Sequence, residues 1–482
     1  MGEAGVVTSL KVELHKSFNW KMATTLLLGI ICMAGINYLP LPAGLTLAGL
    51  RSLAVLLLAV TLWITEIVHP AVTAMMIVVI LSLAKIITFE KALAGFADTS
   101  IALLVSIYIL SAAMIKSGFD RRLAFFLLRL SKGNINLNLL MVALTMIVFT
   151  FLIPTSAGRA ALMVPICTGI ANAMELKPGS NIGRAMFLIV PFTSLIFSSS
   201  LLTGSLSMIY AVSLFQRVAG YSWNYLSWMA MMVPGSLITV LLVWLMLLRV
   251  FPPEIKELNK GLQYIQEQLA RMGPMTMAEK KVALLFIGML LLWVTNFLHH
   301  LPTALVSLLA ATLTFFPGFN LQSWKEAMVK VDWGTVILFG GSLSLASGLK
   351  ETGAMDWLAA VAFGNLRTGN VALLGLMVLG ICIVIRLGFN SVLGASTVIL
   401  PMVMATAANL GIEPVWLGMI GVVGCELCMF LPTQSPTLLA TYGTGFYSTR
   451  DTLKAGSLAT LLLVGVTLVM ASFYWPLLGL KP

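Results

Sequence analysis

The chain alternates long apolar stretches with short polar connections. Repeated apolar runs of about 20 residues have the length that a helix needs to cross the hydrocarbon core of a bilayer. We therefore expect membrane-spanning helices at each of the plain runs. These runs lie at about 24–39, 52–66, 71–86, 101–115, 228–248, 283–297, 303–316, 334–349 and 458–477.

Four further apolar segments carry polar residues and helix breakers near their middle. Segments 137–173 and 372–408 are long enough to enter the membrane and return, with polar turns at 154–159 and 386–394. Broken backbone at membrane depth is tolerated only where it is buried in protein or lines a cavity. We predict a re-entrant hairpin in each. Two long helices are predicted to be interrupted: 185–215 at 198–205, and 416–442 at 432–437.

The two hairpin segments are related by an internal repeat. A shift of 236 positions places Pro165 on Pro401, Gly158 on Gly394 and Thr155 on Ser391. Five predicted crossings separate the start of one repeat from the start of the next, because a re-entrant hairpin adds none. An odd number of crossings predicts that the two repeats have inverted topology. The run at 24–39 is an extra span outside the repeat.

These elements predict an all-α polytopic membrane protein with about 11 transmembrane helices and two re-entrant hairpins. Inverted repeats with interrupted helices in corresponding places mark secondary transporters, whose substrate site lies near the midplane. The expected units are a cytoplasmic surface helix at 1–21, scaffold spans at 22–132, a first half of a transport domain at 133–250, a cytoplasmic linker at 251–282, scaffold spans at 283–368 and a second half of the transport domain at 369–482.

Composition agrees with this class. Of 482 residues, 59% are hydrophobic and 10% are charged, and the mean hydropathy is +0.99, whereas about a quarter of the residues of a soluble protein are charged. The net charge of +11 is no signal for nucleic acid, since short cytoplasmic loops collect Lys and Arg. With the N-terminus cytoplasmic and the C-terminus outside, 20 of the 29 basic residues fall in inner segments. The compact loops suggest a bacterial inner (plasma) membrane.

Enzymatic chemistry finds little support in the sequence. There is no Ser/His/Asp set, no acidic metal motif and no glycine-rich phosphate loop. Cys425 and Cys428 have the spacing of a redox or zinc pair, but no second ligand pair accompanies them. We expect no cofactor other than Na⁺ as a coupling ion, and we expect that the protein is not an enzyme. An integral-membrane enzyme acting on an anionic lipid remains a less favoured alternative.

The hairpin turns and helix breaks carry the candidate binding residues. Half-helix N-termini expose unpaired N–H groups and a partial positive charge, which favours an anion. Hydroxyl and amide groups can donate to carboxylate or sulfonate oxygens. The candidate substrate-binding residues are Thr155, Ser156, Ala157, Gly158, Arg159, Ser199, Ser200, Thr203, Asn390, Ser391, Thr433, Gln434, Ser435 and Thr437.

Three ionisable residues lie inside these apolar segments. Arg159 either binds the substrate carboxylate or caps carbonyl groups in place of a cation, and we favour the first interpretation. Arg386 lies earlier in its hairpin and either serves the site or extends to the membrane surface. Glu426 is either a proton carrier or the partner of a buried arginine, and we favour the second.

The stretch 431–437, Leu-Pro-Thr-Gln-Ser-Pro-Thr, looks like the Pro-x-Ala-Thr-Pro-Pro-Asn break of the divalent anion/sodium symporter (DASS) family. Trp333-Gly334 with 338–341, Leu-Phe-Gly-Gly, also resembles the stretch before that family's second hairpin. The similarity covers nearly the whole chain. The family marks each hairpin tip with Ser-Asn-Thr, whereas this chain has Thr-Ser-Ala at 155–157 and Ser-Val-Leu at 391–393.

The resemblance implies a homodimer that moves its transport domain like an elevator. It also implies sodium sites at the tips, which carried over to this chain would use Thr155, Ser156, Asn390, Ser391 and Gly394. The function we expect is secondary transport of small organic anions, di- or tricarboxylates or related sulfonates, by sodium-coupled symport or anion exchange, with proton symport also open. Symport of an inorganic anion such as sulfate is the main alternative.

Overall fold

The computed structural model describes residues 41–482 apart from 66, 364–369 and 390. The predicted surface helix at 1–21 and the predicted span at 24–39 lie outside the described residues. In the described part the chain is helical throughout, with a single isolated bridge between Asn134 and Glu257 as its only strand-like pairing. Seven of the described helices are long and apolar enough to cross a membrane. The all-α membrane fold predicted from the sequence is confirmed.

The helices form two series with the same order. The first series is α3 (Leu47–Thr65), α4 (Pro70–Leu83), α5 (Phe89–Leu93), α6 (Thr99–Ser117), α7 (Phe119–Arg129), α8 (Ile135–Leu152), α9 (Ser156–Ala173), α10 (Asn181–Ser198), α11 (Leu206–Ala219) and α12 (Tyr225–Val250). The second is α14 (Met277–Val294), α16 (Thr303–Leu313), α17 (Trp324–Lys330), α18 (Trp333–Glu351), α19 (Ala354–Phe363), α20 (Val371–Leu387), α21 (Val392–Leu410), α22 (Pro414–Cys425), α23 (Pro436–Tyr442) and α24 (Thr449–Val469).

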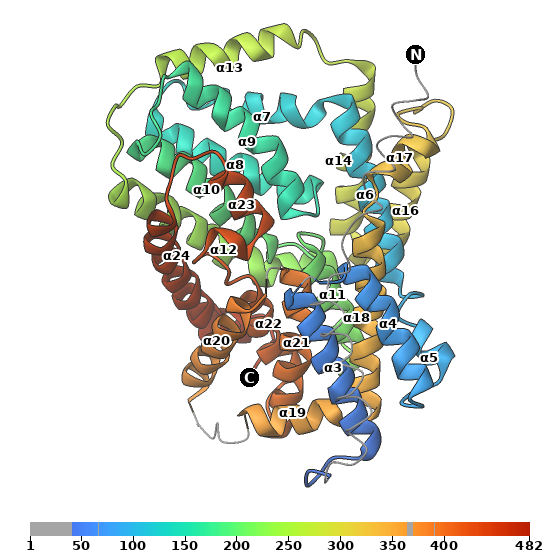
Figure 1. Ribbon diagram of the computed structural model, residues 1–482. Helices are drawn as coiled ribbons and strands as arrows, with labels where there is room; N and C mark the ends of the chain where they lie inside the picture. Colours follow the sequence, from blue (N-terminus) through green and yellow to red (C-terminus); the bar gives the residue numbers. More distant parts are fainter. Residues whose placement is uncertain (1–40, 66, 364–369, 390) are drawn as a thin grey trace, which may run out of the picture.

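The two series point in opposite directions. The pair α8 and α9 lies at the end of the molecule that carries α13 (Asn259–Arg271), whereas α20 and α21 lie toward the opposite end, near α19 (Figure 1). Short helix α15 (Asn296–His299) follows α14, and α24 continues through Met470–Tyr474 into α25 (Trp475–Leu477). The repeat detected in the sequence therefore extends over ten helices in each half.

Each hairpin tip is shaped by its sequence. Pro154 disfavours helical backbone at the residue before it, and Ile153 is extended, with φ −128° and ψ 114°. The next helix begins after Thr155, whose Oγ1 accepts a hydrogen bond from the N–H of Gly158 (3.2 Å). In the second hairpin Ser391 Oγ accepts in the same way from the N–H of Gly394 (3.2 Å).

The helix breaks differ in length. The first spans 199–205, between α10 and α11, where it was predicted. The second begins earlier than predicted, because α22 ends at Cys425 and α23 starts only at Pro436. Pro432 accounts for part of this difference, since it holds the preceding Leu431 in extended backbone (φ −124°, ψ 144°). The longer break places Glu426 outside the helix.

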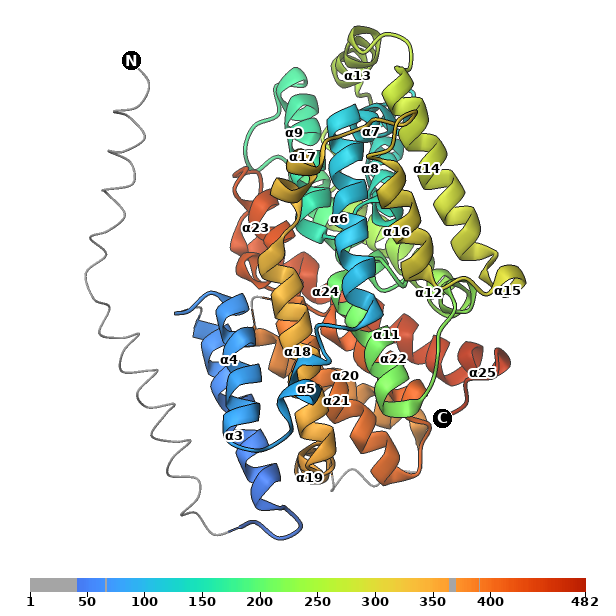
Figure 2. The same ribbon diagram turned by 90° about the vertical axis from the view of Figure 1, so that its right-hand side faces the viewer.

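Packing joins the two series crosswise. Helix α11 contacts α21 and α23 contacts α9, so the helix after each break rests on the hairpin of the other repeat. Helix α4 lies beside α18 and α6 beside α16 (Figure 2). The approach of α18 to α4 is close enough to need a glycine, because a Cβ added at Gly341 would lie 2.6 Å from the carbonyl oxygen of Ala74.

Helix α13, between the two repeats, contacts both α7 and α9. Its C-terminal end is held by Arg122 of α7. The Arg122 guanidinium donates to Glu279 Oε1 (2.6 Å) and to the carbonyls of Met272 (3.0 Å) and Gly273 (2.8 Å). The Glu279 side chain is only 3% exposed, so Arg122 joins α7 to both the end of the linker and the start of α14.

Replacing Arg122 tests this anchor. Arg122→Ala removes the ion-pair partner of a buried carboxylate and the donor to three carbonyls, those of Met272, Gly273 and Pro274. Breaking a buried ion pair costs about 3–5 kcal/mol. We expect the variant to melt at a clearly lower temperature in detergent. The matched control is Lys116→Ala, which removes an exposed pair with Glu326 (2.8 Å) and should leave the melting temperature unchanged. Equal shifts in the two variants would contradict the assignment.

Candidate functional site

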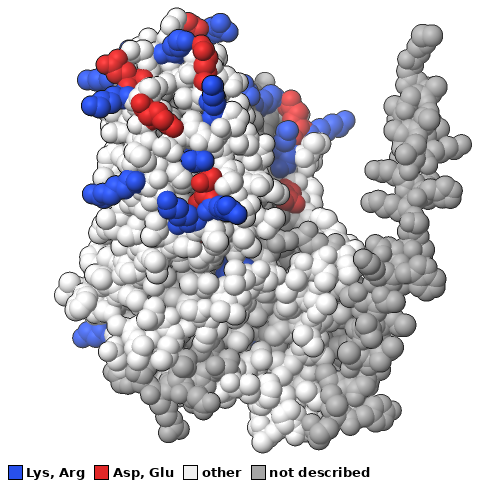
Figure 3. All heavy atoms as spheres, turned by 60° about the vertical axis from the view of Figure 1, so that its left-hand side comes forward, with Lys and Arg blue, Asp and Glu red and all other residues white. Residues whose placement is uncertain are grey.

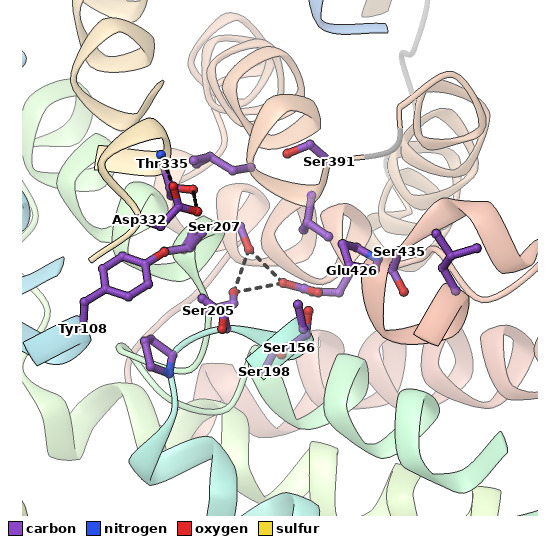
Figure 4. Close-up of a pocket in the computed structure, with 18 of the residues that line it drawn as sticks. Tyr108, Ser156, Ser198, Ser205, Ser207, Asp332, Thr335, Ser391, Glu426 and Ser435 are labelled. Atoms are coloured by element: carbon purple, nitrogen blue, oxygen red, sulfur yellow. Dashed lines mark hydrogen bonds between the residues drawn. The ribbon is translucent and has the colours of Figure 1, made fainter. Parts of the chain in front are cut away.

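Both hairpin tips and both helix breaks meet at one cavity of about 510 Å³. Each of the four helices that begin at a tip or a break has a hydroxyl residue as its N-cap: Thr155 for α9, Ser205 for α11, Ser391 for α21 and Ser435 for α23. All four line the cavity. Figure 4 shows Ser156 and Ser391 on different sides of it, with Ser205 and Ser435 from the breaks. The repeat has thus placed four equivalent helix starts around a single space.

The helix starts leave N–H groups at the cavity wall. The first residues of a helix have no intrahelical acceptor for their N–H groups. Each N-cap hydroxyl accepts only the N–H of the third helical residue, such as Gly158 or Gly394. The N–H groups of the first two residues have no acceptor among the described residues at α9, α11 and α21. These residues also line the cavity: Ser156, Ala157, Leu206, Ser207, Val392 and Leu393.

Arg159 does not line the cavity. It is fully buried behind the first hairpin tip and makes five hydrogen bonds. It joins the tip to the first break by donating to the carbonyls of Ile153 (3.0 Å) and Gly204 (2.8 Å). Its other bonds go to Ser194 Oγ (2.9 Å), the Ser194 carbonyl (3.3 Å) and Ser198 Oγ (2.7 Å). This geometry corresponds to the carbonyl-capping interpretation rather than to the substrate-binding one that we favoured.

Arg386 does the same in the second repeat, from a different position in the sequence. It is also fully buried, and its guanidinium donates to the carbonyls of Phe389 (2.8 Å) and Gln434 (3.3 Å). Phe389 is the repeat equivalent of Ile153. Gln434 directly precedes the N-cap of α23, as Gly204 directly precedes the N-cap of α11. Arg386 therefore does not extend to the membrane surface.

Among the described residues, two carboxylates line the cavity and no Lys or Arg side chain does. Glu426 comes from the second break, and its Oε1 accepts hydrogen bonds from Ser207 (2.8 Å) and Ser205 (3.1 Å) of the first repeat. Among the described residues it forms no ion pair with either arginine, although both act on it electrostatically. Asp332 caps α18 and accepts from the N–H and hydroxyl of Thr335 (3.0 and 2.6 Å).

The structure distributes the predicted site residues over two groups. Thr155, Ser156, Ala157, Ser391, Thr433 and Ser435 line the cavity. The others do not line it. Gly158 and Gly394 donate their N–H groups to the N-cap hydroxyls, and the Gln434 side chain accepts from the N–H groups of Phe430 and Leu431. The Ser199 hydroxyl donates to the Ile196 carbonyl, Thr203 forms a hydrogen bond with Tyr225, and Ser200 and Thr437 are buried. Asn390 lies outside the described residues.

Sequence reasoning missed residues that the structure brings to the cavity. Ser198, Ser205, Leu206 and Ser207 flank the first break, while Tyr108, Asp332 and Thr335 come from α6 and the start of α18. The spacing from Asp332 to Thr335 is that of a helix N-cap and its third residue, so the helix start was detectable. Its position at the cavity was not, because only tertiary packing brings α18 there.

The comparisons with known proteins agree with this architecture. The family model described as the sodium:sulfate symporter transmembrane region matches residues 20–481. The structure is similar to the crystal structure of the YdaH transporter of Alcanivorax borkumensis, which has been described as having an unusual topology. The TM-score is 0.58, the match covers 82% of this chain and 89% of that one, and the sequences are 15% identical. That similarity concerns the fold.

Two relatives in sequence match this chain over nearly the whole length of both proteins. A membrane protein of Cupriavidus necator is 27% identical, covering 98% of this chain and 95% of its own. The sodium-dependent dicarboxylate transporter SdcS of Staphylococcus saprophyticus is 26% identical, covering 97% and 94%. The fold and its paired breaks define a membrane transporter. More specifically, the chain belongs to the sodium:sulfate symporter family, the divalent anion/sodium symporter family that its breaks resemble.

Arg159 and Arg386 each act as a clamp that joins a hairpin tip to a helix break, and the two can be compared in a matched test. Arg159 serves five acceptors, and a lysine ammonium has three donors. Arg159→Lys therefore loses at least two of these hydrogen bonds, each worth about 1.5–3 kcal/mol because the donor is charged. Arg386→Lys loses less, because among the described residues Arg386 donates to three carbonyls and its Nε has no partner. We expect thermal unfolding to show the larger shift for Arg159→Lys, and the reverse order would refute this description.

Proposed function

We propose that the protein is a secondary transporter of small organic anions, di- or tricarboxylates or related sulfonates. The observation that carries the proposal is the convergence of two hairpin tips and two helix breaks, from inverted repeats, on one cavity. Unpaired N–H groups and hydroxyls along the wall are suited to carboxylate or sulfonate oxygens. The relatives named as sodium-dependent dicarboxylate transporters support this substrate class.

We infer that the hairpins, the broken helices and the spans after them, at 133–250 and 369–482, move together. The crosswise contacts of α11 with α21 and of α23 with α9 support their treatment as one body. Tyr108, Asp332 and Thr335 belong to the proposed scaffold and close the cavity from the other side. A cavity between a moving body and a scaffold is what an elevator-type motion requires. In this proposal the protein acts as a homodimer.

The proposed orientation rests on charge. On the face shown in Figure 3, Lys and Arg side chains gather at the end of the molecule that carries α13, and few of the described ones appear toward the other end. Cytoplasmic loops are enriched in these residues. We therefore assign the α13 end to the cytoplasm, with the N-terminus inside and the C-terminus outside, in a bacterial plasma membrane.

The proposed coupling takes account of two observations. The family and the SdcS relatives favour sodium as the coupling ion, and a sodium site would draw on Thr155, Ser156, Asn390, Ser391 and Gly394. The two guanidinium groups, however, already hold the tip carbonyls of Ile153 and Phe389. We propose that these fixed cations supply the positive charge at the tips, so that exchange of anions proceeds without sodium.

Uptake of radiolabelled succinate into proteoliposomes tests the function. We expect uptake that is driven by internal succinate, persists when sodium is replaced by choline and is competed by citrate. Ala157 is an exposed residue of the cavity wall, so Ala157→Trp should block uptake while Ala157→Ser preserves it. An absolute need for sodium would show that the tips still coordinate the ion.

Sulfate transport is the second candidate, favoured by the description of the matching family. The same liposomes distinguish the two. Stronger competition by sulfate than by succinate or citrate would assign the cavity to an inorganic anion. Uptake of neither class would refute the proposed function.

A further inference from the structure

Within the described part of the chain, Glu426 is the one buried carboxylate at the cavity wall. The residue is 1% exposed. Its Oε1 atom accepts two hydroxyl hydrogen bonds from Ser205 and Ser207, whereas its Oε2 atom has no partner among the described residues. Figure 4 shows the carboxyl group in the middle of the site, between the two breaks. It is therefore placed to meet any anion that enters.

Fixed groups of opposite effect surround this carboxyl. It follows the C-terminal end of α22, where the helix carbonyls disfavour a negative charge. It faces the N-terminal start of α11, and two buried guanidinium groups lie nearby, all of which favour a negative charge. Because these influences oppose each other, one added charge in the cavity can decide whether Glu426 is ionised.

The charged side chains near Glu426 are held by partners of their own or lie across the cavity. Helix α21 contributes no ionisable group, and Tyr108 and Asp332 lie across the cavity. The elements around Glu426 contribute these groups: Arg386 and Cys382 of α20, Arg159 and Cys167 of α9, Tyr210 and Arg217 of α11, Tyr442 of α23, and Cys425 and Cys428 beside it. Arg217 is paired with Asp98 (2.7 Å). Arg159 and Arg386 are held by backbone carbonyls.

We propose that Glu426 takes up one proton when a dianion enters the cavity and releases it when the anion leaves, an inference that rests on the proposed function. An ionised Oε2 would repel a substrate carboxylate at the same wall. A protonated Oε2 can donate a hydrogen bond to it. The proton comes from water on the side where the anion binds and returns to water on the side where it leaves, so that no bond other than O–H forms or breaks.

This link also sets the charge of the loaded site. Arg159 and Arg386 contribute two fixed positive charges. With Glu426 protonated, a bound dianion balances them, whereas with Glu426 ionised one negative charge remains uncompensated in a low-dielectric interior. The loaded, protonated site is therefore the form best suited to move through a membrane.

Calorimetric titration of the purified protein with succinate, in two buffers of different ionisation enthalpy, counts the protons taken up. We define the pH midpoint of binding as the pH above which the affinity for succinate begins to fall, because Glu426 of the free protein is then ionised. Above it we expect the wild-type protein to take up about one proton per succinate and to lose about tenfold in affinity per pH unit. Glu426→Gln should bind succinate with no proton uptake and with an affinity that does not depend on pH. Glu175→Gln changes an exposed carboxylate paired with Lys260 and should match the wild type.

A second variant keeps the test decisive if Glu426→Gln does not fold. Ser207→Ala removes a donor to Oε1, which disfavours the ionised form and should move the pH midpoint of binding upward. Proton uptake that persists in Glu426→Gln, or binding by the wild type without proton uptake, would overturn the proton link alone. Failure of the wild type to bind any organic or inorganic anion would overturn the proposed function and this inference together.

Discussion

Unwound backbone inside a membrane protein needs partners for its carbonyl groups, and here two buried guanidinium groups provide them. Arg159 joins the first hairpin tip to the first break, and Arg386 joins the second tip to the second break. An unpaired carbonyl in a dry interior costs free energy comparable to a lost hydrogen bond. The position of each tip against its break, and hence the shape of the cavity between them, depends on these two clamps.

The clamps also explain how the cavity can suit an anion without a basic residue in its wall. The arginines lie behind the tips and neutralise carbonyl dipoles there, while the helix starts present N–H groups to the open space. Glu426, a carboxyl buried at this wall, joins the second break to the hydroxyls of the first through hydrogen bonds from Ser205 and Ser207. This polar contact between the two repeats therefore lies at the cavity itself.

Much of this fold was predictable because its signals are local. Prolines, glycines and hydroxyl residues in otherwise apolar runs marked both tips and the first break, and the 236-residue shift related the two hairpins. The role of Arg159 was not predictable, since its acceptors Ser194 and Gly204 lie 35 and 45 positions away in the sequence. The early start of the second break was also missed, because nothing between Glu426 and Leu431 resembles a helix breaker.

The placement of the two arginines has a consequence for how the repeat is compared within the chain. Arg159 follows its tip on α9, whereas Arg386 precedes its tip on α20, yet they reach equivalent carbonyls. At these two arginines the pseudo-symmetry of the repeats is therefore one of acceptors rather than of donors. An alignment of the two halves pairs Arg159 with Ala395 and Arg386 with Thr150, and so shows two unrelated substitutions. In the structure, both arginines have the same role, because each joins a tip carbonyl to a break carbonyl.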